Sequence, residues 1–290
     1  MMGRWAKTLL TFSTSQHIIF LVIFMENIGL IAGNNRFPFL VAEEIKKRGD
    51  RVVCIALKEE ADPELEKICD KTFWLPLGKA QKIIDSLKSE NVKTVIMAGQ
   101  VKHVRIYSAL NLDWRAIKLM GSLVNKKTDT ILGAVAGEFE KDGMNLLPSH
   151  IYLTHLLAPK GLISGKKLNS DEQKDVDFGF KIAKGIAGFD IGQTVVVKDK
   201  SVLAVESIEG TDECIKRAYA LGGENSVVVK VAKPNQDFRF DVPVIGVKTI
   251  DILKENKVRV MAVETGVTLI LDKDEVIKKA NESNVTIVGV

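Results

Sequence analysis

One polar stretch near the end of the chain holds the residues best suited to chemistry. It carries two carboxylates, Asp237 and Asp241, on either side of Arg239. Carboxylate oxygens can bind a hard cation, and a guanidinium offers a planar fork that fits a phosphate. Two lysines, Lys230 and Lys233, add point charges nearby. The stretch therefore predicts a site for a phosphate-bearing ligand.

The apolar residues of the same stretch predict how it is held. In an extended chain, polar and apolar side chains would project to opposite sides, with Phe238, Phe240 and Val242 anchored in a core. The Cα atoms of Asp237 and Asp241 would then lie roughly 13 Å apart, too far to share a proton or one metal ion. The two acids would hold different roles unless the segment bends. An amphipathic edge strand with an Asp–Arg pair is the alternative interpretation.

A second polar group follows a strand predicted at 202–206. Alternation places Glu206 on one face with three apolar residues: Val202, Ala204 and Ile208. A carboxylate in such company must be paired, bound to a ligand or protonated, which favours a site. The acidic turn continues with Glu209, Gly210, Thr211 and Asp212, in which Thr211 is predicted to cap the next helix. A capped helix accounts for Thr211 and Asp212 without any function, but it leaves Glu206 unexplained.

Glycines follow two predicted strands in the first half of the chain. Gly33-Asn34 comes after the strand 28–32, and Gly99-Gln100 after the strand 94–98. Carboxyl ends of parallel strands meet at one edge, where such sheets bind ligands. Backbone N–H groups at a helix N-terminus would stabilise an anion there. The GxGxxG spacing is missing, so an ordinary strand-to-helix turn remains the alternative.

The order of elements predicts two α/β domains. In the first half, apolar runs alternate with helical patterns, which favours a Rossmann-like, mainly parallel sheet over residues 25–157. Its strands are expected at 28–32, 52–57, 72–77 and 94–98, and its helices at 38–49, 79–89 and around 119–140. Pro and Gly at 157–161 predict a boundary. Residues 158–290 are expected to form a mixed α/β catalytic domain.

Elements of the second half follow a less regular order. Helices are expected at 171–186, 212–221, 249–256 and 273–283. Strands are expected at 193–197, 202–206, 227–231, 260–263, 269–271 and 286–288. Residues 1–24 begin with two cations and continue uncharged, but their apolar part is too short to span a bilayer. We interpret them as an extension from a mistaken start codon, with an anchoring segment as the alternative.

Composition excludes several classes of protein. The formal net charge of +4 comes without dense Lys/Arg runs, so nucleic acid is not expected as a partner. The three cysteines are widely separated and show no CxxC spacing, which predicts neither a disulfide framework nor a thiolate zinc site. A reducing cytoplasm fits this cysteine usage best.

Together these segments resemble the LpxI family, the UDP-2,3-diacylglucosamine pyrophosphatases of lipid A biosynthesis. The resemblance runs from residue 28 to residue 290. Its most specific pieces are GLIAG at 29–33, MAGQV at 97–101, DIGQ at 190–193, VLAVESIEGTD at 202–212 and KPNQDFRFDVPVIG at 233–246. The chain departs from the family at Asn34 and Asn35, and at 128–130, where TDT replaces GDD. These departures leave the nucleotide contacts, including that of Asp129, open.

The resemblance implies hydrolysis of a UDP-sugar diphosphate to UMP and 2,3-diacylglucosamine 1-phosphate, with attack at the phosphorus next to the sugar. It also implies dependence on a divalent cation such as Mg²⁺. Asp241 matches the family's RxD acid and is expected to hold the metal or orient the attacking water, with Asp237 as second choice.

The remaining positions that the resemblance implies are expected to bind the substrate. They are Gly33, Asn34, Gly99, Gln100, Val101, Asp129, Gln193, Glu206, Glu209, Gly210, Thr211, Asp212, Lys230, Lys233, Gln236 and Arg239. Two acyl chains on the substrate call for an apolar wall and favour peripheral contact with the inner membrane from the cytoplasm. The residues leave a homodimer open.

Two other functions compete with this hypothesis. A non-catalytic UDP-sugar or lipid-binding protein would keep the fold, but the intact Asp241 argues against it. A dinucleotide-dependent oxidoreductase would use the first domain, but the GxGxxG fingerprint is missing. Release of UMP from the diacyl substrate would separate hydrolysis from both.

Overall fold

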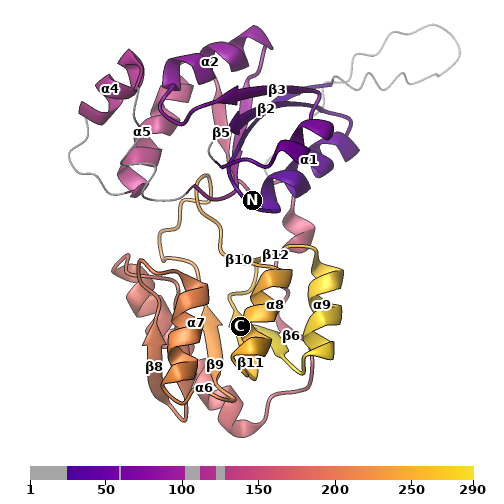
Figure 1. Ribbon diagram of the computed structural model, residues 1–290, viewed down its shortest axis with the longest axis vertical. Coiled ribbons are helices and arrows are strands. Elements are labelled where there is room, and N and C mark those ends of the chain that lie inside the picture. Colours follow the sequence, from indigo (N-terminus) through magenta and orange to yellow (C-terminus); the bar gives the residue numbers. More distant parts are fainter. Residues whose placement is uncertain (1–24, 59, 102–111, 122–127) are drawn as a thin grey trace, which may run out of the picture.

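The computed structural model describes residues 25–58, 60–101, 112–121 and 128–290. Residues 1–24, predicted to be an extension or an anchor, lie outside the described residues. The side chain of Asp129, in helix α5, also lies outside what the structure describes. Two α/β lobes make up the described chain, one above the other in Figure 1. Among the described helices, none combines the length and apolar character needed to cross a membrane.

A five-stranded sheet forms the centre of the N-terminal lobe. All its strands are parallel. Their order across the sheet is β3 (Lys71–Leu75), β2 (Arg51–Leu57), β1 (Asn27–Ala32), β4 (Thr94–Ala98) and β5 (Asn145–Leu147). This is the strand order of a Rossmann-like fold, as predicted. The three-residue strand β5 was not predicted, because so short an apolar run gives no periodic signal.

Helices cover both faces of this sheet. Helix α1 (Phe37–Lys47) has Pro38 in its first turn and buries Val41, Ala42 and Ile45 on one face. On the other face lie α2 (Ala80–Ser89), α4 (Trp114–Gly121) and α5 (Thr128–Lys141). Of these, α2 and α5 contribute side chains to the second core cluster. A short 3-10 helix, η1 (Pro63–Lys67), follows β2.

The C-terminal lobe is a mixed α/β domain, as predicted, and contains a six-stranded mixed sheet. Its order is β6 (Gly161–Ser164), β13 (Thr286–Gly289), β11 (Val260–Val263), β9 (Val227–Lys230), β7 (Thr194–Lys198) and β8 (Ser201–Val205). Strands β13, β11 and β9 are parallel to one another, whereas β6 is antiparallel to β13 and β7 to both β8 and β9. The edge strand β6 was not predicted.

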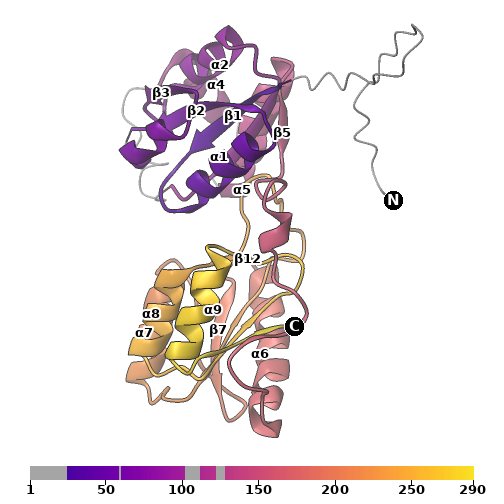
Figure 2. The ribbon, with the colours of Figure 1, turned by 90° about the vertical axis from the view of Figure 1, so that its right-hand side faces the viewer.

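Helices also lie on both sides of the second sheet. Helix α6 (Ser170–Gly188) covers one face, and Figure 2 shows it apart from the helices of the opposite face. Those helices are α7 (Thr211–Ala220), α8 (Val247–Glu255) and α9 (Lys273–Glu282). The sheet is therefore sandwiched, and residues beyond its carboxyl edge face the N-terminal lobe (Figure 1).

The two lobes share part of a core. Two short parallel strands, β10 (Val244–Ile245) and β12 (Leu269–Ile270), lie at the junction. Val242, Leu269 and Leu271 are buried in the same cluster as helix α1 of the N-terminal lobe. Arg36 also bridges the lobes, with Nε 3.3 Å from Asp272. The predicted boundary at 157/158 lies between the 3-10 helix η2 (Thr154–Leu156) and β6.

Candidate active site

The polar stretch around Asp241 is a turn, so the extended ribbon predicted from the sequence is wrong. The N–H groups of Phe240 and Asp241 both donate to the carbonyl of Asp237, at 3.1 and 3.3 Å. Asp241 therefore folds back toward Asp237. The physical reason is that no strand of the described chain pairs with this stretch, so its backbone groups are satisfied within the turn and by Ser149.

Phenylalanines anchor this turn, as predicted, but to two different parts of the N-terminal lobe. Phe238 packs against the cluster on the α1 side of the sheet, and Phe240 against the cluster on the α2 side. Ser149, which is 1% exposed, fixes the backbone between them. Its N–H donates to the carbonyl of Phe238 at 2.8 Å, and its hydroxyl to that of Arg239 at 2.9 Å. The N-terminal lobe thus holds in place the loop of the C-terminal lobe that carries Asp237 and Asp241.

Replacing Ser149 with alanine should loosen this loop. The variant leaves the partly buried carbonyl of Arg239 without its donor, which costs about 1–3 kcal/mol of unfolding free energy. We expect a matching fall in the midpoint of urea unfolding. The backbone bond from residue 149 to Phe238 survives, so the turn should remain. Unchanged stability would show that the hydroxyl contributes nothing.

Asp241 lies at the centre of a hydrogen-bonded cluster. Its Oδ2 accepts from Nε2 of Gln193 at 2.9 Å and from Nε2 of Gln236 at 2.8 Å. Gln236 also donates to the Asp241 carbonyl at 3.0 Å, and its Oε1 accepts from the N–H of Lys233 at 2.9 Å. The carboxylate is half-buried, and among the described residues no cation pairs with it. Within the described chain, the side chains that hold this carboxylate are therefore neutral amides.

The cluster continues from Gln193 into the C-terminal sheet. The N–H of Gln193 donates to Oε2 of Glu206 at 3.1 Å, and the hydroxyl of Thr211 to Oε1 of Glu206 at 2.8 Å. Lys230 in turn donates to Oγ1 of Thr211 at 2.8 Å. The fold thus brings together five residues that were selected separately from the sequence: Asp241, Gln193, Glu206, Thr211 and Lys230.

Two details of the sequence prediction around Glu206 are wrong. Strand β8 ends at Val205, and Ile208 is 92% exposed, so Glu206 does not sit on an apolar face. Gly210 caps helix α7, with φ +84, and Thr211 is its first helical residue. A glycine takes that backbone conformation easily. The Thr211 hydroxyl does not cap the helix and is instead hydrogen-bonded to Glu206 and Lys230.

The other candidates form ion pairs around the cluster. Arg239 donates to both oxygens of Asp237, from Nε to Oδ1 at 3.0 Å and from Nη2 to Oδ2 at 2.8 Å, and these hydrogen bonds lower the pKa of the Asp237 carboxyl. Arg239 also lies 3.4 Å from Glu140 of α5. Lys233 pairs with Asp190 at 2.5 Å. Asp190 stands in the DIGQ motif but was not selected as a site residue.

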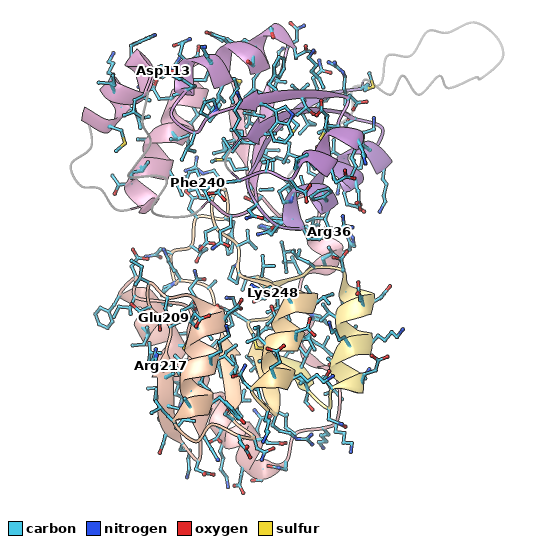
Figure 3. The ribbon with its side chains drawn as sticks, in the orientation of Figure 1. Arg36, Asp113, Glu209, Arg217, Phe240 and Lys248 are labelled. Carbon is cyan, nitrogen blue, oxygen red and sulfur yellow. The ribbon has the colours of Figure 1, made fainter. Side chains whose placement is uncertain are left out.

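Glu209 and Asp212 lie at the end of the C-terminal lobe that faces the other lobe. In Figure 3, Glu209 and Lys248 lie at this end, and Phe240 and Arg36 lie across from them. Arg217 donates to Glu209 at 2.7 Å, which lowers the pKa of the Glu209 carboxyl, and Lys248 pairs with Asp212 at 2.7 Å. Both acids therefore border the junction as components of ion pairs.

Residues of the N-terminal lobe meet at the carboxyl edge of its sheet, as predicted. The N–H of Asn34 donates to the carbonyl of Gln100 at 2.8 Å, and that of Gln100 to Asn34 at 3.1 Å. A Cβ at Gly33 would lie 2.6 Å from the Gln100 oxygen, so this approach requires glycine. Val101 packs in the cluster that also receives Phe240. Among the described residues, no hydrogen bond joins Gly33, Asn34, Gly99 or Gln100 to Asp241.

His150 gives this anchoring region a pH dependence. Its ring stands edge-on to Phe238, with centroids 5.3 Å apart and planes at 77°. Burial lowers the pKa of His150 below its ordinary 6.5, because it disfavours the charged imidazolium. The unfolded chain then binds the proton at higher pH than the folded chain. Above pH 6.5, the neutral imidazole of His150 makes its full contribution to the free energy of unfolding. This contribution is lost as the pH falls below 6.5.

The His150→Gln variant tests this dependence. We expect its unfolding free energy to fall less than that of the parent between about pH 8 and about pH 5. Urea unfolding at the two pH values measures the difference. Carboxylates elsewhere titrate equally in both proteins, so they cancel in the comparison. Equal losses in parent and variant would remove His150 as a cause.

Oxygen ligands for a metal ion are sparse in the described part of the chain. No group of three or more His, Cys, Asp or Glu residues there could hold an ion. Glu206 has both oxygens engaged, and Asp237 is paired with Arg239. Oδ1 of Asp241 accepts no hydrogen bond from the described residues. Because Mg²⁺ is usually held by one or two carboxylates together with substrate phosphates and water, this single oxygen fits such an ion.

The fold and the cluster define a two-lobed α/β protein with a Rossmann-like lobe and an acidic site at the junction. The LpxI N-terminal domain family matches residues 27–156, and the LpxI C-terminal domain family matches residues 159–288. UDP-2,3-diacylglucosamine pyrophosphatase LpxI of Caulobacter vibrioides is 31% identical over 277 residues, which cover 92% of this chain and 98% of that protein. The chain belongs to the LpxI family.

Solved structures are much less similar. The biotin carboxylase domain of Hydrogenobacter thermophilus 2-oxoglutarate carboxylase is 14% identical, with a TM-score of 0.23 over 68% of this chain and 41% of that chain. N5-carboxyaminoimidazole ribonucleotide synthetase from Thermotoga maritima is 16% identical, with a TM-score of 0.23 over 64% and 43%. The chain spans less than half of each, and likenesses this low carry no argument about its fold or function.

Proposed function

We propose that this protein hydrolyses the diphosphate of UDP-2,3-diacylglucosamine, giving UMP and 2,3-diacylglucosamine 1-phosphate in lipid A biosynthesis. The observation that carries the proposal is the Asp241 carboxylate, held on one oxygen by two neutral amides and unpaired with any cation among the described residues. A site meant only to bind a diphosphate would place cations there, because an anion repels phosphate. Membership of the LpxI family supports the same reaction.

Each part of the cluster has a role in the proposed reaction. Asp241 holds the metal ion or orients the attacking water. A bound Mg²⁺ would neutralise charge on the diphosphate and polarise its phosphorus. Lys230 and Lys233 stabilise the charge that builds up on the phosphate oxygens during the reaction. The N-terminal sheet edge at Gly33 and Gln100 takes part of the nucleotide or sugar.

Apolar side chains next to the cluster suit a lipid substrate. Phe189, Ile191 and Ile208 are exposed on the two loops that carry Gln193 and Glu206. These loops touch, because a Cβ at Gly192 would lie 2.1 Å from the carbonyl oxygen of Glu206. Exposed apolar groups on loops beside a polar site are typical of a surface that contacts a membrane or an apolar ligand. We propose that the substrate's acyl chains extend toward this surface from the membrane.

The experiment that tests the proposal follows product release directly. The purified protein is supplied with UDP-2,3-diacylglucosamine, Mg²⁺ and detergent in H₂¹⁸O. We expect UMP to be released and the ¹⁸O to appear in the sugar phosphate, because attack falls on the phosphorus next to the sugar. Label in UMP would contradict that position of attack. Substrate binding without release of UMP would favour a UDP-sugar or lipid-binding protein instead.

A further inference from the structure

We propose that Gln193 is a positioning residue for Asp241 and that Glu206 holds Gln193 in place. This inference rests on the proposed hydrolysis for its kinetic consequences, whereas its geometric consequence does not. Gln193 would fix the orientation of the Asp241 carboxylate so that Oδ2 is held and Oδ1 is presented to the reacting groups. Glu206, chosen from the sequence as a substrate contact, would act through Gln193 instead.

The direction of every hydrogen bond in the chain of contacts is determined by chemistry. Lys230 can only donate, so the Thr211 hydroxyl accepts from it and donates onward to Glu206. An ionised Glu206 can only accept, and it takes the backbone N–H of Gln193. Asp241 also can only accept, so the Gln193 amide must present Nε2 rather than Oε1. The orientation of the Gln193 side chain is therefore determined at both ends.

This orientation leaves one polar atom unsatisfied. Oε1 of Gln193 is buried and accepts no hydrogen bond from the described residues. A buried acceptor without a donor destabilises the folded protein, and an apolar residue of the same shape would avoid that cost. Stability alone therefore does not explain a glutamine here. The hydrogen bond that Nε2 of Gln193 donates to Asp241 does explain the glutamine.

Gln236 is the second amide that holds the Asp241 carboxylate. It also donates to Oδ2 of Asp241, so both amides hold the same oxygen and leave Oδ1 outside the network. Two neutral donors fix the position of the carboxylate but bring no positive charge to it. An ion pair would place a positive charge beside it. Gln236 belongs to the turn that carries Asp241, whereas Gln193 precedes β7. Gln193 thus ties the turn to the C-terminal sheet.

Replacing Gln193 with methionine tests the proposal, because methionine keeps the length and removes both polar atoms. We expect kcat for UMP release to fall by about 10- to 100-fold, with KM little changed and the midpoint of urea unfolding no lower than in the parent. Gln173→Met is the matched control, since Nε2 of Gln173 also donates to an aspartate, Asp177, at 2.8 Å. The control should keep the parent's kinetics.

Glu206→Gln supplies the second variant. Both groups that contact the Glu206 side chain donate to it, and a glutamine there has only one oxygen to accept them. One of the two hydrogen bonds is lost, which loosens the Gln193 backbone. We expect a smaller fall in kcat, and the double variant with Gln193→Met should fall no further than Gln193→Met alone, because Glu206 acts through Gln193. Glu172→Gln is the control, since Glu172 also accepts a backbone N–H, that of Asn169, at 2.8 Å.

Several outcomes would overturn the proposal. They are a parent-like kcat in Gln193→Met, a fall in kcat explained by a matching loss of folded protein, and additive losses in the double variant. A crystal structure of Gln193→Met gives a readout that needs no substrate. Asp241 should be reoriented there, and an unchanged carboxylate would refute the positioning role. A parent that releases no UMP would instead refute the proposed function, and the crystal structure would still decide the role of Gln193.

Discussion

Asp241→Asn is expected to lower kcat for UMP release by about 10³-fold, the largest effect of any single substitution in the site. Asparagine keeps the size of the side chain and an oxygen that can accept from Gln193 and Gln236. It removes the negative charge that would hold the metal ion or activate water. Because the binding groups remain, equilibrium binding of the substrate should persist. Initial rates of UMP release and a binding titration measure the two effects.

Asp237→Asn is the matched control for this prediction. Asp237 is exposed and already paired with Arg239, and an exposed ion pair contributes about 1 kcal/mol or less. Its loss should therefore lower the rate only slightly. Equal turnover by Asp241→Asn and the parent would remove Asp241 from the reaction. A larger loss in Asp237→Asn than in Asp241→Asn would exchange the roles of the two acids.

Gly192→Ala should have the second largest effect. A Cβ at this position would lie 2.1 Å from the carbonyl oxygen of Glu206 and 2.6 Å from its carbonyl carbon. Both are backbone atoms, so one of the two loops must move. The movement separates Gln193 from Glu206 and shifts the amide that holds Asp241. We expect about 1–3 kcal/mol of destabilisation and a fall in kcat/KM of about 10²-fold.

A glycine of the preceding helix provides the comparison. Gly185 lies within α6, and a Cβ there would have no neighbouring atom of the described residues within 4 Å. Gly185→Ala should stabilise the protein by about 0.5–1 kcal/mol, because alanine loses less backbone entropy in a helix. Its kinetics should match those of the parent. If Gly192→Ala were as stable and as active as Gly185→Ala, the close approach of the two loops would not matter for catalysis.

The sequence by itself determined most of the fold. Strands β1, β2 and β4 lie within one residue of their predicted bounds, because a run of buried apolar residues ended by glycine or a charge is a strong local signal. The alternation of strands and helices also determined the parallel first sheet. The sequence patterns and family motifs together selected Gln193, Glu206, Thr211, Lys230 and Asp241, and these residues form one cluster. Their roles stay predictions.

Only the tertiary structure decided how that cluster is built. A local pattern of phenylalanines and acids around Asp241 suggested an extended ribbon, yet the backbone turns because its carbonyls find donors in Ser149, some 90 residues away in sequence. Ser149 showed no signal of its own, since a serine after a short strand is common in loops. The contact between Gln193 and Asp241 likewise joins residues 48 apart. The first of these contacts joins the two lobes and the second joins two loops of the C-terminal lobe, and no local periodicity encodes either of them.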